Sequence, residues 1–426
     1  MTNTDPAPIA TAPRAASVDR APTVVTVTMA LAQFGLFVGL LAPVTVSLAI
    51  KTQTLVPADQ AAAVNGNVLA VAALFALIGN PVFGRLSDLT MSRYGRRRPW
   101  MVGGAVVFVG AMLVVALATS VSVLLVGWCV AQLAGNAMLA ALLATIADQV
   151  PPAQRASVAA NVGVMQSLGI LAAAYIAALF VDSIVALFVV PGVIALVLVV
   201  VFCAVLPDRQ LTHRPEIGGW LALLRTFWVN PVRHPDFGWA WLSRFLVFLA
   251  YFLFISFRMF YLQQHVGLPA ADAAGTLALG ALVFTIALVI TAKIGGWLSD
   301  RTGLRKIFVV VSILILAIAF ALLGVTTTVP GFLLVEAVMG LGYGVYYAVD
   351  TALVVDVLPD RENAAKDLGV MNIANALPQS LAAALGGVLL AIGTDGASTN
   401  YVALFIGAGT IGMLGALAIL PIRSVR

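Results

Sequence analysis

The stretch G-R-L-S-D-L-T-M-S-R-Y-G-R-R-R-P-W, residues 84–100, organises the rest of the chain. It holds five arginines and one aspartate in seventeen residues, and apolar runs of membrane-spanning length flank it on both sides. Dense positive charge beside a membrane span is typical of the cytoplasmic side. We therefore expect a tight cytoplasmic hairpin here. The alternatives are a plain topology anchor and, in a soluble chain, a nucleic-acid patch, which the long apolar flanks argue against.

The composition points the same way. Of 426 residues, 62% are hydrophobic and 10% are charged, whereas soluble globular proteins carry about a quarter charged residues. We therefore expect an all-α polytopic membrane protein. The net charge of +5 is carried mainly by short loops, so we expect no nucleic-acid partner. Cys129 and Cys203 fall far apart inside apolar runs, which argues against a disulfide or a metal site.

Apolar runs near the twenty residues that a spanning helix needs recur along the chain. Residues 1–22 have no signal-peptide core near their start, so we expect a loose cytoplasmic tail there. We place the spanning helices, twelve in all, at residues 24–50, 62–84, 99–119, 121–147, 156–181, 183–206, 237–264, 272–298, 305–325, 330–355, 366–392 and 399–422. An even number of spans puts both termini on one side, which we expect to be the cytoplasm.

The basic residues test this topology. Nineteen of the 23 lie in segments that the twelve-span arrangement places inside, and the outer loops hold only Lys51. An inverted or odd-numbered topology would spread these charges over both sides. We therefore expect a multi-pass protein of the cell (inner) membrane.

An internal repeat accounts for the number twelve. Three features of the first half return in the second at offsets of 206–212 residues: residues 84–88 as 296–300, residues 163–166 as 369–372, and Asp148 as Asp356. We therefore expect two six-helix bundles, at 23–206 and 237–426, joined by a cytoplasmic central loop at 207–236. In this loop, apolar residues at helical spacing favour a short surface helix at 217–228 over a plain linker.

Residues 84–100 resemble the loop between helices 2 and 3 of major facilitator superfamily transporters, whose signature is G-x-L-x-D-x-x-G-R-[RK]. The longer pattern S-D-x-x-x-S-R-x-G-R-R-R-P, at 87–99, is most similar to the sucrose transporters and the glycoside-pentoside-hexuronide symporters. The resemblance implies two halves related by an axis along the membrane normal, with the substrate site between them near the midplane. It also implies a carrier that works by alternating access, and we expect it to be a monomer.

The same resemblance implies a cytoplasmic gate. Asp88 and Asp300 would face the first turns of helices 11 and 5 across the boundary between the halves, where a helix dipole favours a carboxylate. The neighbouring arginines and Asp148 would complete a charge cluster that holds the cytoplasmic side shut. The alternative is a static staple of the loop. The gate candidates are Asp88, Arg96, Arg97, Asp148, Asp300, Arg305 and Asp356.

Polar side chains inside the spans are candidates for the substrate site, because they are costly in hydrocarbon. Amides can donate to and accept from sugar hydroxyls, although they serve helix packing equally well. Tyrosine rings stack on sugar rings, and also on lipids and drugs. The candidates are Gln33, Gln132, Asn136, Asn161 and Gln166 in the first half, and Tyr343, Tyr346, Asn372, Asn375 and Gln379 in the second.

Depth along the helices predicts two ion pairs in the second half. Arg244 and Asp350 each lie about 10 Å from the inner boundary, and Arg258 and Glu336 lie fourteen residues farther out on nearly the same helical faces. We therefore expect Arg244 to pair with Asp350 and Arg258 to pair with Glu336. Lys293 is the competing partner for Asp350. Interfacial snorkelling is the alternative for the outer pair.

Asp350 is the acidic residue placed deepest in the bundle, so we expect it to couple flux to protons. A conformational change that moves Arg244 or Lys293 toward or away from this carboxylate would release or capture a proton. A permanent salt bridge that only orients helix 10 is the alternative.

The expected function is proton-coupled transport of a polar organic solute, with a sugar or glycoside favoured. The chain lacks three features of its relatives: the helix 4 carboxylate of sucrose transporters, the helix 2 aspartates of sodium-coupled symporters, and the G-P-x-x-G-G motif of many drug exporters. An exporter of a hydrophobic compound and a sensor or lipid-handling protein on the same fold are the alternatives. We expect no enzyme activity and no cofactor.

Overall fold

The computed structural model of the chain describes residues 21–208, 210, 229–359, 364–393 and 399–425. Within these ranges the protein is all-helical, and twelve helical segments are long and apolar enough to cross a membrane. Each span expected from the sequence is present, so the twelve-span all-α fold is confirmed. Most of the expected tail, and the surface helix expected at 217–228, lie outside the described residues.

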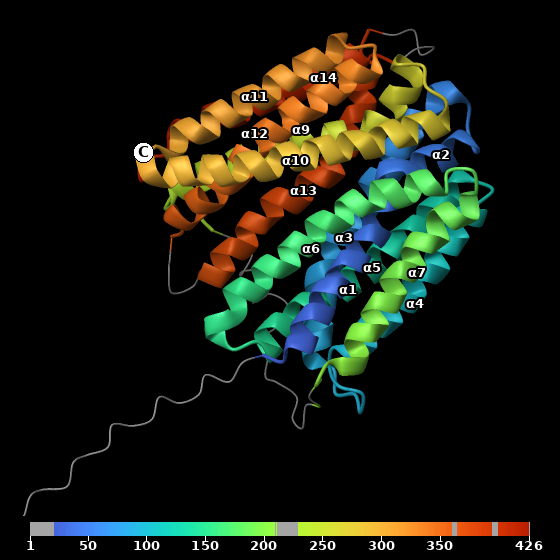
Figure 1. The fold of residues 1–426 in the computed structure, drawn as a ribbon, viewed down its shortest axis with the longest axis vertical. Coiled ribbons are helices and arrows are strands. Elements are labelled where there is room, and N and C mark those ends of the chain that lie inside the picture. Colours follow the sequence, from blue (N-terminus) through green and yellow to red (C-terminus); the bar gives the residue numbers. More distant parts are fainter. Residues whose placement is uncertain (1–20, 209, 211–228, 360–363, 394–398, 426) are drawn as a thin grey trace, which may run out of the picture.

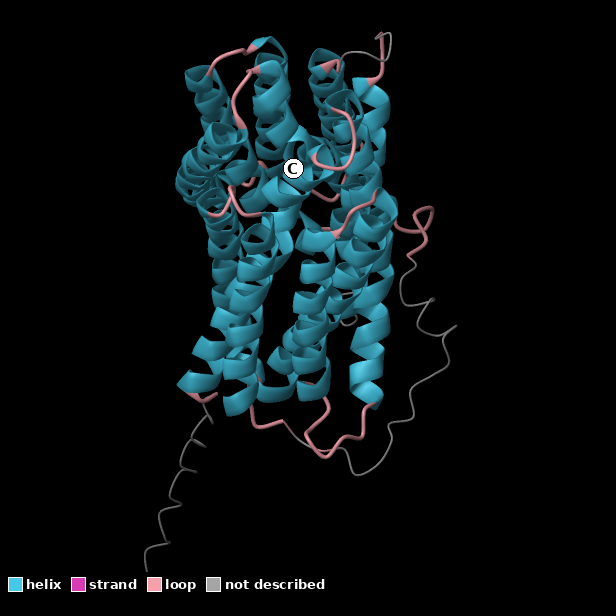
Figure 2. Ribbon diagram, turned by 90° about the vertical axis from the view of Figure 1, so that its right-hand side faces the viewer, coloured by secondary structure: helices cyan, strands magenta, loops and turns pink. Residues whose placement is uncertain are grey.

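Each half of the chain supplies six spans. In the first half they are α1 (Thr23–Ala42) with η1 (Pro43–Ser47) and α2 (Leu48–Gln53), then α3 (Ala58–Leu89), α4 (Arg98–Leu117), α5 (Val121–Gln149), α6 (Pro152–Leu179) and α7 (Ile184–Val205). In the second half they are α9 (Pro235–Phe260) with η2 (Tyr261–His265), then α10 (Ala270–Thr302), α11 (Arg305–Val325), α12 (Val329–Asp356), α13 (Ala364–Leu390) and α14 (Tyr401–Ile419). Figure 1 shows the two halves as separate bundles, one blue to green and the other yellow to red. Figure 2 shows long helices joined mostly by short loops.

The first span widens in its middle. Pro43 has no backbone N–H and cannot continue the regular helical ladder, so the chain passes through the π-helical segment η1. The Leu48 N–H then donates to the Pro43 carbonyl, five residues back, and α2 continues the span. The proline therefore bulges the span without ending it.

The arginine-rich hairpin is shorter than expected. Residues 84–89 are the last turns of α3, and only 90–97, called here the arginine loop, connect α3 to α4. The hydroxyls of Ser87 and Thr90 donate to carbonyl oxygens one turn earlier, and no glycine or proline follows residue 84 to end the helix sooner. Gly95 has a φ of 96°, which lets the chain turn back toward α4.

The two halves meet at the far end of the molecule, opposite the arginine loop. Gln53 donates to Gln263 at 2.5 Å, and Gln264 donates to the first backbone carbonyl of α3 at 3.1 Å. A Cβ on Gly66 would lie 2.7 Å from the carbonyl oxygen of Ala383, so a glycine is needed for α3 and α13 to approach this closely. These contacts close the far end.

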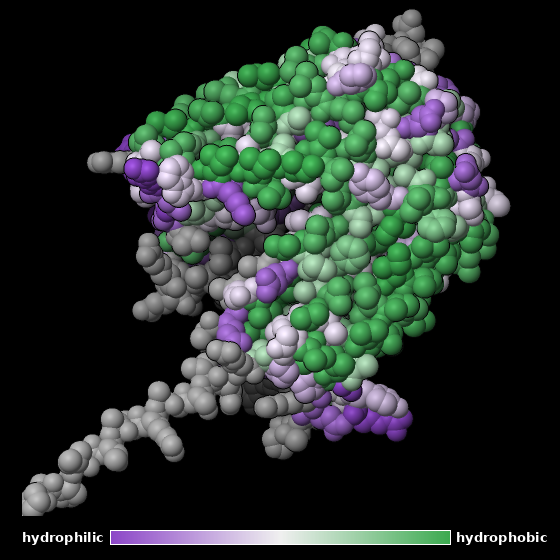
Figure 3. Space-filling view, in the orientation of Figure 1, coloured by the Kyte–Doolittle hydropathy of each residue, from purple (hydrophilic) through white to green (hydrophobic). Residues whose placement is uncertain are grey.

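The halves diverge toward the arginine-loop end. Figure 1 shows the bundles converging beside α2 and spreading toward the side where the C-terminus lies. Figure 3 shows a hollow between them on that side, while green apolar residues cover most of the outer surface seen in this view. An apolar belt of this kind suits a surface that faces lipid. The structure is therefore closed at the far end and open at the arginine-loop end.

Candidate functional site

Arg97 is the centre of a charge cluster at the arginine-loop end of the first half. Its guanidinium lies 2.6 Å from Asp88 Oδ1 and 2.9 Å from Asp148 Oδ2, and it donates to the Ser87 hydroxyl at 2.5 Å. Arg96 adds a second ion pair with Asp148. The Arg97 side chain is only 4% exposed. Shielded charge therefore holds α3, the arginine loop and α5 together.

Asp208, three residues after α7, joins this cluster to the central loop. Its carboxylate accepts from the backbone N–H groups of Arg97 at 2.7 Å and Arg98 at 2.9 Å, which caps the N-terminus of α4. The Arg98 side chain donates in turn to the Leu206 carbonyl at the end of α7. The role of Asp208 could not be predicted from the sequence, because it lies 111 positions from the first N–H that it caps.

The second half carries a looser version of the same cluster. Arg305 pairs with Asp356 and lies 3.7 Å from Asp300, which is 72% exposed. Lys306 donates to the Leu420 carbonyl at the end of α14, as Arg98 does at the end of α7. The repeat seen in the sequence therefore extends to side-chain contacts.

These contacts show the gate residues in one conformation only. In the ion pairs of the described residues, Asp88 and Asp300 each contact an arginine of their own half. Asp88 is also 44% exposed, which fits a position at the edge of the open side. This conformation separates the halves at the arginine-loop end, so contacts that would hold the gate shut stay a prediction. The ion pairs of these clusters brace the loops within each half.

Both ion pairs predicted from depth are present inside the second half. Arg244 Nε lies 3.3 Å from Asp350 Oδ2, and Arg258 Nη1 lies 3.2 Å from Glu336 Oε1. All four side chains are buried, so snorkelling does not describe the outer pair. Lys293 is exposed on α10, and Arg244 is the cation paired with Asp350.

The two ion pairs are the ends of a ladder between α9 and α12. On α9, Tyr251 lies seven residues from each arginine, and on α12, Tyr343 lies seven residues from each carboxylate. The rings of these two tyrosines stack with centroids 4.3 Å apart. Seven residues make about two helical turns, so each rung faces the same direction. Asp350 therefore lies one rung away from a buried aromatic stack.

The expected substrate residues divide into three groups. Gln33 donates to Gln166 Oε1 at 3.1 Å, linking α1 and α6. Asn136 donates to the Gln132 carbonyl of its own helix, an arrangement typical of packing. The remaining members are the exposed Asn161, the buried Tyr343 and Tyr346, the half-buried Asn375 and Gln379, and Asn372, whose side chain lies outside the described residues.

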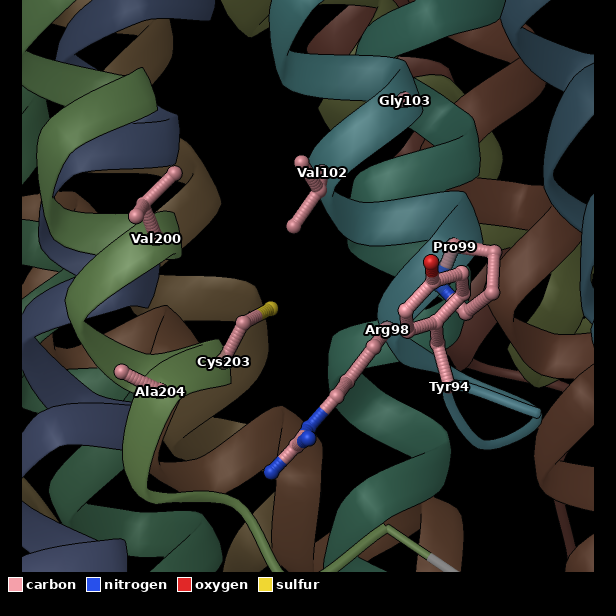
Figure 4. A pocket seen from close by; sticks show the side chains of 8 residues that line it. All are labelled: Tyr94, Arg98, Pro99, Val102, Gly103, Val200, Cys203 and Ala204. Carbon is pink, nitrogen blue, oxygen red and sulfur yellow. The ribbon is translucent and has the colours of Figure 1, made fainter. Parts of the chain in front are cut away.

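A groove on the outside of the first half is a separate feature. It lies between α4 and α7, has a volume of about 410 Å³, and its walls include Val102, Val200, Cys203 and Ala204 (Figure 4). The Arg98 side chain extends across one end of it (Figure 4). Its walls are largely apolar, and that arginine is already engaged by the end of α7. The groove therefore lacks the polar groups expected of a solute site.

No group of histidine, cysteine or acidic side chains within the described ranges could hold a metal ion. Both cysteines are free and buried.

A comparison with protein families matches residues 23–295 and 282–426 to the Major Facilitator Superfamily. Among curated proteins, the chain is 51% identical over 47 residues to an uncharacterized symporter of Synechocystis, covering 11% of this chain and 9% of that protein. It is 30% identical over 346 residues to a triacylglyceride transporter of Mycolicibacterium smegmatis, covering 66% of this chain and 61% of the relative. The chain spans less than two thirds of the length of both curated relatives.

Solved structures show the same fold at low identity. The nucleoside transporter NupG aligns with a TM-score of 0.72 at 14% identity, covering 94% of this chain and 100% of that one. A bacterial homologue of the human lysosomal transporter Spinster, in an inward-facing unoccupied conformation, aligns with a TM-score of 0.66 at 16% identity, covering 94% and 98%. None of these relatives singles out the sucrose or glycoside branch.

Proposed function

The chain belongs to the major facilitator superfamily, and we propose that it carries a polar organic solute, a sugar or glycoside, across its membrane together with protons by alternating access. That it is a multi-pass membrane transporter follows from the family and the twelve spans. The solute class and the coupling ion are the proposal.

The observation that carries the proposal is the buried pair of Arg244 and Asp350. Ionisable side chains within a bilayer are costly and are retained for function more often than for stability. The Asp350 side chain is 3% exposed and that of Arg244 is 10% exposed, so the partners are held almost free of solvent. A carboxylate in this position can hold a proton whenever its cation is withdrawn.

Alternating access supplies the movement that coupling needs. The pair joins α9 to α12. The helix α9 also packs against α3 at the closed far end, where a Cβ added to Gly66 would lie 3.2 Å from the Phe257 ring. When the far end opens, α9 must shift against α3. Coupling then requires that α9 also shifts against α12 within the second half, so that the distance between Arg244 and Asp350 changes. Proton capture would then accompany one conformation and proton release the other.

The first half supplies neutral recognition groups. Gln33 is buried, donates to Gln166, and has a side-chain oxygen with no hydrogen-bond partner. Such amides offer donors and acceptors that match hydroxyl groups on a solute. A neutral polar solute fits this lining better than an ionic one.

The arginine loop defines the proposed orientation. Nineteen of 23 basic residues lie in segments on its side, so we place this side and both termini in the cytoplasm of a cell (inner) membrane. The described conformation is then inward-open. The protein is proposed to act as a monomer, with each half serving as one side of the alternating-access pathway.

Reconstituted transport tests the proposal. The purified protein in liposomes should take up a member of a sugar and glycoside panel saturably, and an inwardly directed proton gradient should raise accumulation above equilibrium. A pH-sensitive dye inside the vesicles should report proton entry only when that solute is present. Absence of saturable flux for the whole panel would reject the solute class. Flux that ignores the gradient would reject proton coupling.

An apolar solute is the second candidate. It is favoured by the similarity to a triacylglyceride transporter and by the aromatic rungs between α9 and α12. The same liposomes distinguish the two classes if a fluorescent acylglycerol is included in the panel.

A further inference from the structure

Four aromatic rings from α9, α10 and α12 form a series in the second half that ends at the exposed Tyr347. Phe284 of α10 stacks with Tyr251 at 6.1 Å between centroids and an interplanar angle of 28°. Tyr251 stacks with Tyr343 at 4.3 Å and 18°, and Tyr343 stacks with Tyr347 at 6.3 Å and 27°. The planes are therefore nearly parallel from one ring to the next.

Phe284, at one end of the series, is half-buried, and Tyr347, at the other end, is exposed. Tyr343 is 8% exposed, whereas Tyr347 is 51% exposed. Each internal ring has an aromatic neighbour on either side, and the outermost ring, Tyr347, keeps half of its surface free. A ring arranged in this way can accept one further ring.

Tyr347 is on the inner side of α12. It lies one turn from Tyr343 and one turn from Asp350, the residues that contact α9. The exposed leucines Leu334 and Leu341 lie about 120–140° farther around the helix. Tyr347 is thus on the face turned toward α9, away from the exposed leucine face.

We propose that Tyr347 is a stacking platform for a planar ring attached to the polar part of the transported solute, such as the aglycone of an aryl glycoside, and that it favours this planar ring over a saturated ring of the same size. This inference rests on the proposed function, because it deepens the substrate class of the same site. A planar ring on Tyr347 extends the existing series by one member, and the polar part of the solute then lies within one helical turn of the Arg244–Asp350 pair. Saturated rings bury similar area but lack the flat π-face that favours stacking.

Matched probe pairs test the platform. Phenyl β-D-glucopyranoside and cyclohexyl β-D-glucopyranoside share the sugar and differ in one ring, and benzamide with cyclohexanecarboxamide repeats the comparison without a sugar. We expect the purified protein in nanodiscs to bind the planar member of a pair about 2- to 10-fold more tightly by calorimetry. Tyr347→Leu should remove this preference, and Tyr347→Phe should keep it. Tyr94→Leu, at an exposed tyrosine of the arginine loop, is the matched control and should change nothing.

Equal binding within both pairs, no binding by either planar compound, or a preference that survives Tyr347→Leu would each overturn the platform. If Tyr347→Leu misfolds, protection of wild-type Tyr347 from iodination by the planar probes, but not by the saturated ones, replaces the variant. Binding is measured without a proton gradient, so its failure is separate from failure of proton-driven uptake. A planar preference in a protein that shows no coupled uptake would keep the platform and reject the proposed transport function.

Discussion

The two halves of the molecule repeat one scaffold but place their charge differently. Residues 99–147 and 156–181 of the first half contain no Asp, Glu, Lys or Arg, and its polar groups in the spans include the amide pair of Gln33 and Gln166. The second half buries two arginine–carboxylate pairs between α9 and α12. Within the proposed function, the first half contributes neutral recognition and the second half responds to protons.

At the arginine-loop end, the first half holds the more deeply shielded charge and the second half the more exposed charge. The first-half cluster is compact, with Arg97 4% exposed, and Asp208 reinforces it from the central loop. The second-half cluster is open, with Arg305 25% exposed. The repeat therefore conserves which residues pair and changes how strongly each pair is shielded from solvent. Shielding decides how much an ion pair contributes, so the halves can be compared by matched substitutions.

The largest expected effect comes from the outer rung of the ladder. Glu336→Gln leaves Arg258 charged and buried without a partner, because the two side chains are 0% and 6% exposed. We expect a loss of about 3–5 kcal/mol in unfolding free energy. Reversible unfolding in bicelles measures it.

The double variant Arg258→Met with Glu336→Leu is the control. It removes both charges and should recover most of the lost stability. A stable Glu336→Gln protein that has lost proton coupling would show instead that the outer rung is the coupling site.

The two loop clusters allow a matched comparison between the halves. Arg97→Gln removes charged hydrogen bonds from a shielded site and should cost about 2–3 kcal/mol. Arg305→Gln makes the same change at the exposed site and should cost less than about 1 kcal/mol. Melting temperatures of the two variants in one detergent check the order.

Equal losses of stability in the two variants would contradict the role given to shielding.

The proposed gate is tested by a different measurement. Asp88→Asn should alter the accessibility of cysteine probes at the far end with little change in melting temperature. Destabilisation with unchanged accessibility would favour a static staple.

The sequence predicted the spans and the membrane ion pairs because both depend on position along a helix. Apolar run length locates a span, and a separation of fourteen residues in both helices predicted the partners of Arg244 and Arg258, with Lys293 as the competing partner of Asp350. The actual end of α3 was missed, since no glycine or proline lies at 85–89 and the Thr90 hydroxyl donates to the Leu86 carbonyl in the last turn.

Side-chain exposure was not predictable in the same way. Tyr343, Tyr346 and Tyr347 are neighbours in one motif, yet the first two are buried and Tyr347 is half-exposed. Their environments depend on how α9 and α10 cross α12. The cap made by Asp208, and the choice of which end of the molecule is closed, likewise arise from segments that meet only in the folded chain.

The inner rung should govern coupling. An inward proton gradient of one pH unit supplies about 1.4 kcal/mol per proton, which supports up to about tenfold solute accumulation at one proton per solute. Asp350→Asn should reduce accumulation to the external concentration while solute exchange continues, because the loaded carrier can still reorient. Gradient-driven uptake and counterflow in liposomes separate the two processes.

Arg244 is left without its partner in that variant, so Asp350→Asn combined with Arg244→Gln guards against misfolding. The double variant should also exchange without accumulating. Accumulation that survives either change would make the inner rung structural and place the proton elsewhere.

The smallest expected effect tests the neutral first half. Gln33→Leu removes a donor to Gln166 and an acceptor with no partner of its own, while keeping a side chain of similar size. Interhelical polar contacts in membranes contribute about 0.6 kcal/mol on average, so we expect a small change in stability. If the free oxygen of Gln33 binds the solute, the KM should rise about threefold with kcat nearly unchanged, since the lost contact contributes equally to ground state and transition state.

Asn136→Leu is the matched control, because Asn136 donates to the Gln132 carbonyl of its own helix. The KM of this variant should stay at the wild-type value. The same KM in both variants, with only Gln33→Leu less stable, would assign the first-half amides to packing and leave recognition of the solute to the second half.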